Sequence, residues 1–169
     1  MTTRQQQKGQ TKLDGARGMA EWIAIYQAYN AIFKLTELTL LPHGLSLPQL
    51  HLLAVLKKGD EPITTGEIGR AMVKASQTIT GLVDRLEEPE GFVERVFDRK
   101  DRRKTWVRLT KKGEQKLDEA FPVANRLAEE LSAVLSDEEL KDLQAKMEKL
   151  RSAAMDKLDA ALTSNGRRL

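Results

Sequence analysis

SQTITGLVDRLEEPEGFVERVFDRKDRRKTWVRLTKKG, residues 76–113, decides the fold, because the hydrophobic period changes within it. In its first part, apolar residues recur at i, i+3, i+4 and i+7, which is the spacing of one buried helix face. In its second part, residues 92–97 and 105–110 are rich in β-branched and aromatic residues and predict two strands. The stretch therefore predicts a helix followed by a β-hairpin.

Positive charge is concentrated around the tip of this hairpin. Residues 98–113 hold eight basic and two acidic residues, a balance of +6, whereas the whole chain of 169 residues carries only +3. Five cations lie in the loop itself: Arg99, Lys100, Arg102, Arg103 and Lys104. Such a loop repels itself, and a solubilising turn does not explain its charge density. Binding to nucleic-acid phosphates accounts better for this charge density, because each cation would displace a counterion condensed on the phosphates. We expect Asp101 to pair with a nearby arginine and to hold the tip in shape.

Helices are expected on both sides of the stretch. Residues 17–41 carry aromatic and aliphatic side chains near a 3.6-residue period. N-cap and capping-box patterns predict where the later helices begin: at Ser46 with Gln49, Thr64 with Glu67, Ser76, Thr110, and Ser136 with Glu139. We expect the helix after Thr110 to continue past Pro122 with a bend, because proline removes one backbone hydrogen bond.

These elements predict a mainly α fold with a small β-hairpin, organised as one domain over residues 17–162. Residues 45–110 would form a winged helix-turn-helix lobe, and residues 17–41 and 111–162 would form dimerisation helices. The last helix has a narrow apolar seam that resembles a coiled-coil face, and this seam predicts pairing with a second copy of the chain. The seam consists of Leu140, Leu143, Met147, Leu150 and Leu158. Residues 1–16 and 163–169 are expected to be flexible, and whether the first of them touch DNA stays open.

The predicted helix at 76–87 has a polar face suited to reading a DNA groove. A glutamine such as Gln77 can bond adenine in bidentate fashion, and threonine can reach phosphates or thymine methyl groups. Gly81 would allow close approach. Such a face is also ordinary for a solvent-exposed helix, so the hairpin charge strengthens the DNA interpretation. The candidate DNA-contacting residues of this helix are Ser76, Gln77, Thr78, Thr80, Gly81 and Arg85.

The whole stretch resembles the signature of the MarR family of transcriptional regulators. The resemblance rests on Asp84-Arg85-Leu86-Glu87, Gly91, Asp101-Arg102-Arg103, Val107, Leu109, Thr110 and Gly113. It implies a homodimer that binds a pseudo-palindromic double-stranded DNA, usually as a repressor, with the Arg102/Arg103 tip in the minor groove. It also implies release by a small, often aromatic, molecule bound between the dimerisation helices and the DNA-binding lobe. The chain departs from the family pattern in the EEPEG turn, at Arg99 and at Gly81.

For such a molecule, Trp22, Tyr26, Tyr29 and His51 are the candidate pocket residues, although these aromatics could simply pack in the dimer core. The chain has no cysteine, which excludes disulfides and thiol sensing and suits the cytoplasm. Its two histidines, His43 and His51, lack a metal-ligand spacing, so no metal or other cofactor is expected. No enzyme motif and no membrane segment appears. A dimeric helical scaffold that binds nucleic acid without responding to an effector remains the alternative.

Overall fold

Several helices of this chain begin where a side chain accepts a hydrogen bond from a free backbone amide. In the computed structural model, which describes residues 18–59, 62–97 and 105–164, three capping boxes start three helices. The elements are α1 (Met19–Leu40), the short 3-10 helix η2 (Leu41–His43), α2 (Leu47–Lys58), β1 (Ile63–Thr64), α3 (Thr65–Met72), α4 (Ser76–Glu87), β2 (Val93–Phe97), β3 (Thr105–Leu109), α5 (Lys111–Ser132) and α6 (Asp137–Ser164). The prediction of a mainly α fold with a small β element is confirmed.

Helix α4 starts differently from the sequence-based expectation. Ser76 was expected to cap it, but Ala75 occupies the N-cap position with extended backbone angles, and no side chain caps the helix. The carbonyl of Ala75 accepts the first helical hydrogen bond, from the Ile79 amide at 3.2 Å. Ser76 is therefore the first residue inside the helix, where it is exposed.

The sheet has three antiparallel strands in the order β1-β3-β2. Strands β2 and β3 form the expected hairpin, with Val93 opposite Leu109 and Arg95 opposite Val107. Strand β1 was not expected, because two residues are too short to show an alternating pattern. It pairs with β3 through Ile63 opposite Val107, and this pairing ties the start of α3 to the hairpin.

One hydrophobic core lies beneath the sheet and between helices α2, α3 and α4. The predicted stripe of α4 is part of it, since Ile79, Leu82, Val83 and Leu86 are all buried. The largest side chains with less than 2 % of their surface exposed are Leu40, Leu52, Leu53, Ile68, Ile79, Leu86, Val83, Val93 and Val107. Helix α5 adds Leu117 and Ala120, whereas α6 contributes no buried residue.

The corner between the hairpin and α5 explains two residues of the signature. Thr110 caps α5 by accepting the Gly113 amide at 3.0 Å, and its hydroxyl donates to the Gly91 carbonyl at 2.7 Å. The Phe92 carbonyl lies against the first turn of α5, where a Cβ on Gly113 would come within 1.9 Å of the Phe92 oxygen. Only glycine fits at position 113 without moving the strand away from the helix.

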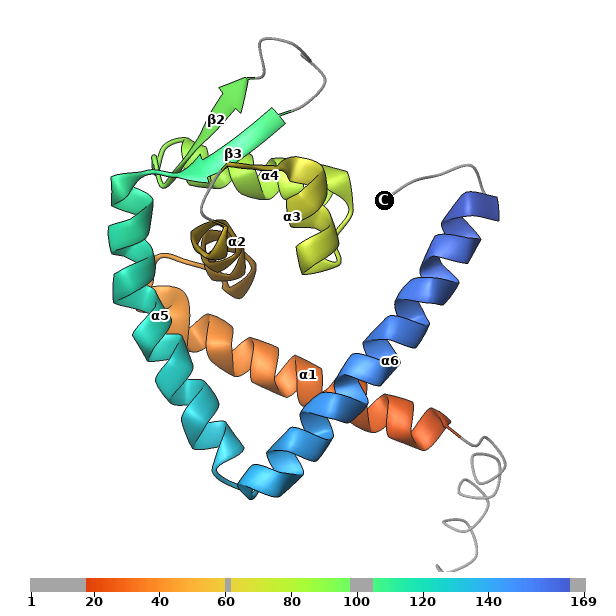
Figure 1. The fold of residues 1–169 in the computed structure, drawn as a ribbon. Coiled ribbons are helices and arrows are strands. Elements are labelled where there is room, and N and C mark those ends of the chain that lie inside the picture. Colours follow the sequence, from red (N-terminus) through yellow and green to blue (C-terminus); the bar gives the residue numbers. More distant parts are fainter. Residues whose placement is uncertain (1–17, 60–61, 98–104, 165–169) are drawn as a thin grey trace, which may run out of the picture.

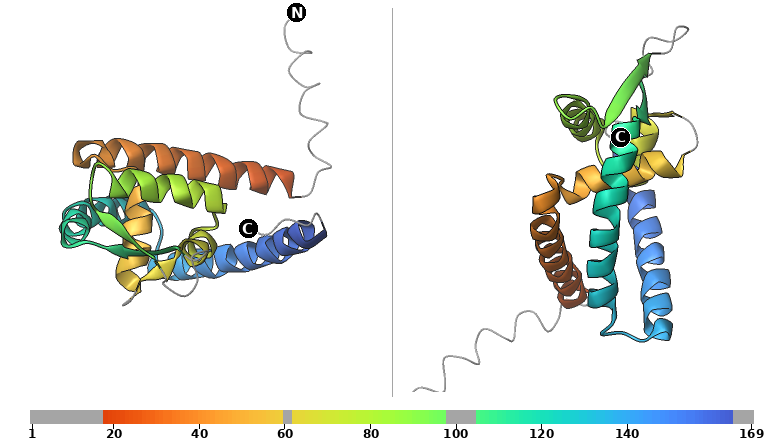
Figure 2. Two further views of the ribbon diagram at one scale, coloured as in Figure 1. Left: turned by 90° about the horizontal axis from the view of Figure 1, so that it is seen from above. Right: turned by 90° about the vertical axis from the view of Figure 1, so that its left-hand side faces the viewer.

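The long helices extend away from the winged lobe (Figure 1). Helix α5 continues through Pro122 and leaves the lobe, and α6 runs back from its far end, diverging from it as a separate arm (Figure 1). Figure 2 shows α1 and α6 apart from each other in both of its views. Large apolar side chains stay exposed along α1, including Trp22, Tyr26 and Tyr29. On α6, Leu143 and Leu150 are also exposed. These two helices therefore present apolar surface that the rest of the described chain does not cover.

Candidate nucleic-acid interface

Helix α4 presents a polar face away from the core. Gln77, Thr78, Thr80 and Arg85 are exposed, and Gly81 is partly exposed. A Cβ built on Gly81 would meet nothing within 4 Å, so this position opens directly to solvent. The structure thus places the six DNA-contact candidates of the predicted recognition helix on one accessible helix.

Helices α3 and α4 are joined by a tight turn with an unusual backbone. Val73 caps α3 with φ +52°, a left-handed conformation that β-branched residues rarely adopt. The Lys74 amide then donates to the Gly69 carbonyl at 2.9 Å, and a Cβ on Gly69 would lie 3.0 Å from the Lys74 oxygen. Close contact in this turn fixes the crossing of the two helices.

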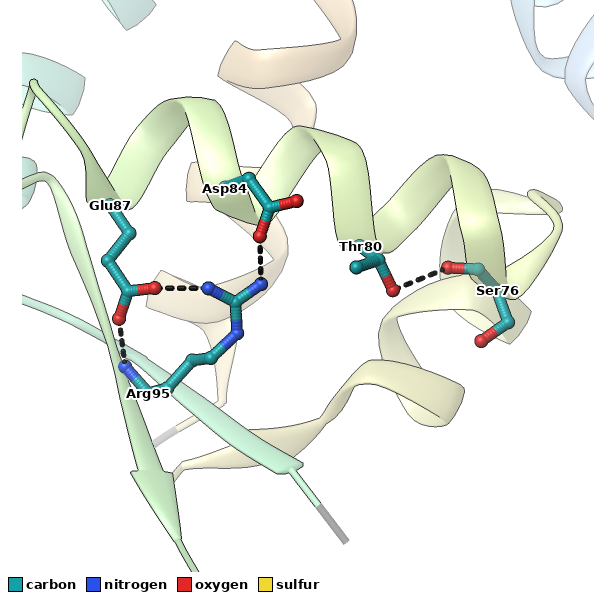
Figure 3. Close-up of polar contacts among 5 residues, drawn as sticks. All are labelled: Ser76, Thr80, Asp84, Glu87 and Arg95. Atoms are coloured by element: carbon teal, nitrogen blue, oxygen red, sulfur yellow. Dashed lines mark hydrogen bonds and ion pairs between the residues drawn. The ribbon is translucent and has the colours of Figure 1, made fainter. Parts of the chain in front are cut away.

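The other side of α4 is fixed to strand β2 by Arg95 (Figure 3). The Arg95 guanidinium contacts Asp84 Oδ1 through Nη2 at 2.5 Å and Glu87 Oε2 through Nη1. The Arg95 backbone amide also donates to Glu87 Oε1 at 2.8 Å. One carboxylate of α4 therefore binds both the main chain and the side chain of the same strand residue, which fixes the helix against the wing.

The environment of Arg95 is electrostatically favourable. Its side chain is only 19 % exposed. Partial burial lowers the pKa of Arg95, but hydrogen bonds and the charges of Asp84 and Glu87 outweigh it, so the pKa is raised overall. Sequence reasoning quoted Asp84 and Glu87 as part of a signature and gave Arg95 no role. The available signal was two acidic residues three apart on the helix, followed by an arginine in the next strand.

The wing strands carry a second cross-strand ion pair, between Arg108 Nε and Glu94 Oε1 at 2.6 Å, on an exposed face. Register explains it, because Glu94 and Arg108 lie directly opposite each other. The predicted DNA contacts of the wing tip lie outside the residues that the structure describes. They are Arg99, Lys100, Arg102, Arg103 and Lys104, and Asp101, which was expected to support them, also lies outside.

The residues predicted to bind an effector come from two places. Trp22, Tyr26 and Tyr29 lie exposed along α1, and the Tyr29 ring is 5.7 Å from that of Phe33. His51 lies on α2, at a shallow hollow between α2 and α3 that also involves Ala71. Burial, and secondarily the charge of Lys74, lowers the pKa of His51, which favours a neutral imidazole. The hollow beside His51 is not lined by the three α1 aromatics of the same protomer.

Two further properties bear on the kind of site. Within the described ranges, no group of three or more His, Cys, Asp or Glu residues is placed to hold a metal ion. In that same part of the chain, no helix is both long and apolar enough to cross a membrane.

A helix-turn-helix formed by α3 and α4, followed by a β-hairpin and held on a common core, defines a winged helix-turn-helix protein. Known proteins agree with this class. The MarR family model matches residues 43–104. The regulator MhqR from Bacillus subtilis, an HTH-type transcriptional regulator, is 33 % identical over 120 residues, which cover 70 % of this chain and 81 % of MhqR.

Solved structures share the fold. The Staphylococcus aureus MepR–DNA complex has a TM-score of 0.72 at 20 % identity and covers 78 % of this chain and 96 % of MepR. The structure of CouR from Rhodococcus jostii RHA1, bound to p-coumaroyl-CoA, has a TM-score of 0.68 at 19 % identity and covers 75 % of this chain and 88 % of CouR. The chain belongs to the MarR family. It is thus a DNA-binding transcriptional regulator and not an enzyme.

Proposed function

We propose that this protein is a homodimeric repressor that binds a specific, pseudo-palindromic double-stranded DNA and is released by a small, aromatic ligand. The observation that carries the proposal is the accessible polar face of α4, held on both sides by the turn at Val73 and by Arg95. A recognition helix needs such a fixed orientation, because base contacts depend on hydrogen-bond geometry.

In this proposal, α4 enters the major groove and its N-terminal half reads base edges. Gln77 would bond an adenine edge, and Thr78 and Thr80 would contact phosphates or thymine methyl groups. The Thr80 hydroxyl donates to the Ser76 carbonyl at 3.1 Å (Figure 3), so its methyl group remains available. Arg85 would add a phosphate contact. The sequence of the wing tip, residues 98–104, supports a second contact in the flanking minor groove.

A second copy of the chain is the proposed cover for the exposed apolar faces of α1 and α6. Leu143, Met147 and Leu150 are 41, 38 and 47 % exposed in one protomer, at the helical spacing of a coiled-coil seam. A single chain gains nothing from this seam, because α6 buries no residue of its own. Two-fold pairing would place two α4 helices on two half-sites, so the DNA target would have matching symmetry.

The proposed effector is a small aromatic compound that binds between the dimerisation helices and the DNA-binding lobe. CouR, which shares the fold, was solved with p-coumaroyl-CoA. In this chain, Tyr26 and Tyr29 offer phenol groups on α1, and His51 offers a neutral imidazole on α2. In a dimer, α1 of one copy could complete the hollow beside His51 of the other.

Selection of duplexes from a random pool, followed by a gel-shift titration, tests DNA recognition. We expect recovery of a symmetric sequence, and affinity that falls steeply as salt rises. Gln77→Ala should cost about 1–3 kcal/mol on the selected duplex and reduce discrimination at one base pair in each half-site. Lys149→Ala on the exposed side of α6 is the control and should bind as the wild type does. Equal binding to scrambled duplexes and single strands would favour the nonspecific scaffold.

Once the selected duplex is known, release of the protein from that duplex tests the proposed effector. A panel of aromatic carboxylates and phenols should contain compounds that release the duplex, and a Tyr26→Phe/Tyr29→Phe variant should require more of them. Reporter expression under the selected sequence should rise when the gene is deleted if the protein represses. A fall would identify an activator instead.

A further inference from the structure

A shallow groove separates the N-terminal end of α2 from α4, on the side of α4 opposite to Arg95. We call it the α2–α4 groove; it has a volume of about 360 Å³. Pro48 and Leu82 form the apolar part of its wall. Its polar lining comes from the start of α2, the turn between α3 and α4, and α4 itself, and consists of Ser46, Gln49, Lys74, Thr78 and Arg85. Thr78 and Arg85 belong to the recognition helix, whereas Ser46, Gln49 and Lys74 are not among the residues predicted to contact DNA.

The charge of the α2–α4 groove is entirely positive. Lys74 and Arg85 supply two cations, and no acidic residue lines the groove. In the part of the chain that the structure describes, no carboxylate lies within ion-pair distance of either cation. Three other cations of the same lobe differ in this respect, since Lys57, Arg95 and Arg108 each pair with a carboxylate. The groove therefore has uncompensated positive charge that an anion could neutralise.

The groove also holds hydrogen-bond donors that the capping box leaves free. Ser46 Oγ accepts the Gln49 amide at 3.3 Å, and Gln49 Oε1 accepts the Ser46 amide at 2.8 Å. Both interactions use the oxygen atoms as acceptors, so the Ser46 hydroxyl hydrogen and the Gln49 NH₂ group remain available as donors. The backbone at the start of α2 adds no donor from Leu47, because the Leu47 amide already donates to Glu37 Oε1 at 2.5 Å. Side chains would hold the anion.

The position of the groove identifies the anion. If α4 lies in a major groove about 12 Å wide, a sugar-phosphate backbone passes on each side of the helix. The wing strands, joined to α4 through Arg95, lie along one side (Figure 3). The α2–α4 groove borders the other. We propose that this groove binds a backbone phosphate of the DNA, with Lys74 and Arg85 as the cations and with Ser46 and Gln49 as hydrogen-bond donors. The proposal rests on α4 being the helix that enters the major groove.

Substitutions that preserve the capping box can test the groove without unfolding α2. Gln49→Glu keeps the capping-box pattern and the side-chain shape but adds a negative charge. Ser46→Asp and Ser46→Asn both keep a good N-cap and differ in charge. We expect Gln49→Glu and Ser46→Asp to weaken binding by about fivefold, the effect of one like charge about 4 Å away in water. Ser46→Asn should stay within about twofold of the wild type.

Lys74→Gln gives an independent test through the salt dependence of binding. Loss of one phosphate contact on each half-site should lower the slope of log Kd against log salt by about one per protomer. Lys149→Gln on α6 is the matched control and should leave the slope unchanged. Circular dichroism melts would show that every variant is folded. Unchanged affinity in Gln49→Glu and Ser46→Asp, or an unchanged slope in Lys74→Gln, would overturn the proposal.

The experiment separates this proposal from the proposed function. All measurements are made on the selected duplex and on a scrambled duplex of the same length, and a phosphate contact should affect both equally. If the wild type does not distinguish the two duplexes, specific regulation fails but the salt slopes still test the groove. If the Ser46→Asp variant keeps its DNA affinity and instead loses its response to an aromatic carboxylate, the groove binds a small anion and the phosphate proposal is wrong.

Discussion

Arg95 of strand β2 contacts Asp84 of the recognition helix, with Nη2 and Oδ1 2.5 Å apart. The same guanidinium contacts Glu87 one turn later, so a single strand residue fixes both the position and the tilt of α4. It also neutralises carboxylates on the helix that is proposed to approach DNA. Orientation and charge thus depend on one residue that need not touch a base.

Replacing Arg95 with methionine should therefore affect folding and binding together. Unfolding free energy should fall by about 1–3 kcal/mol, because Glu87 loses its charged partner in a partly buried place. DNA affinity should fall by about tenfold as uncompensated negative charge faces the phosphates. Urea melts and gel shifts measure the two effects. Adding Asp84→Asn and Glu87→Gln to the methionine variant should recover part of the affinity, and failure to recover any would show that the charge contribution is negligible.

Gly113 should tolerate no side chain. Gly113→Ala places a methyl group against the Phe92 carbonyl at 1.9 Å, so the strand or α5 must shift. We expect a loss of about 2–3 kcal/mol or more in thermal or urea unfolding. Gly81→Ala is the matched control, since its Cβ would meet nothing within 4 Å and alanine favours a helix interior by about 0.5–1 kcal/mol. A Gly113→Ala variant as stable as the wild type would contradict the close approach seen here.

Much of this fold could be predicted from local sequence. Capping boxes at Ser46, Thr64 and Ser136, and the buried stripe of α4, are written in short-range patterns, and the structure confirms them. What could not be predicted depends on contacts between distant residues. The two-residue strand β1 exists only because β3 pairs with it. The role of Arg95 requires knowing that β2 returns across α4, which no spacing within either element reveals.

Val73 offers a test of the turn between α3 and α4. Its φ of +52° is costly for a β-branched residue, whereas asparagine adopts this conformation more readily. Val73 is 43 % exposed, so little packing is lost on substitution. Val73→Asn should raise the unfolding free energy by about 0.5–1 kcal/mol, measured in urea. Val73→Thr, still β-branched, should give no such gain, and equal stability of the asparagine and threonine variants would show that the turn stores no strain.

His51 should make stability depend on pH. Its pKa in the folded state is lowered, chiefly by burial and then by Lys74, so the unfolded chain binds more protons near pH 6.5 and below. The corresponding stability is present above the unfolded pKa of about 6.5 and is lost as pH falls through the folded pKa. Melting temperature should therefore drop less between pH 7.5 and 5.5 in His51→Gln than in the wild type. Parallel curves would mean that His51 titrates alike in both states.

The apolar seam of α6 allows a test of the homodimer that does not disturb the fold. Leu143 and Leu150 are 41 % and 47 % exposed and take no part in the core, so a Leu143→Glu/Leu150→Glu variant should keep its helical content. Two charges on each seam would repel across a two-fold interface, and light scattering after gel filtration should report a monomer. Val134→Glu, at an 83 % exposed site between α5 and α6, should remain dimeric. If DNA binding needs two copies, the seam variant should also lose affinity for the two-half-site duplex while keeping weak affinity for a single half-site. A wild-type protein that is monomeric at every concentration would refute the proposed cover for α1 and α6.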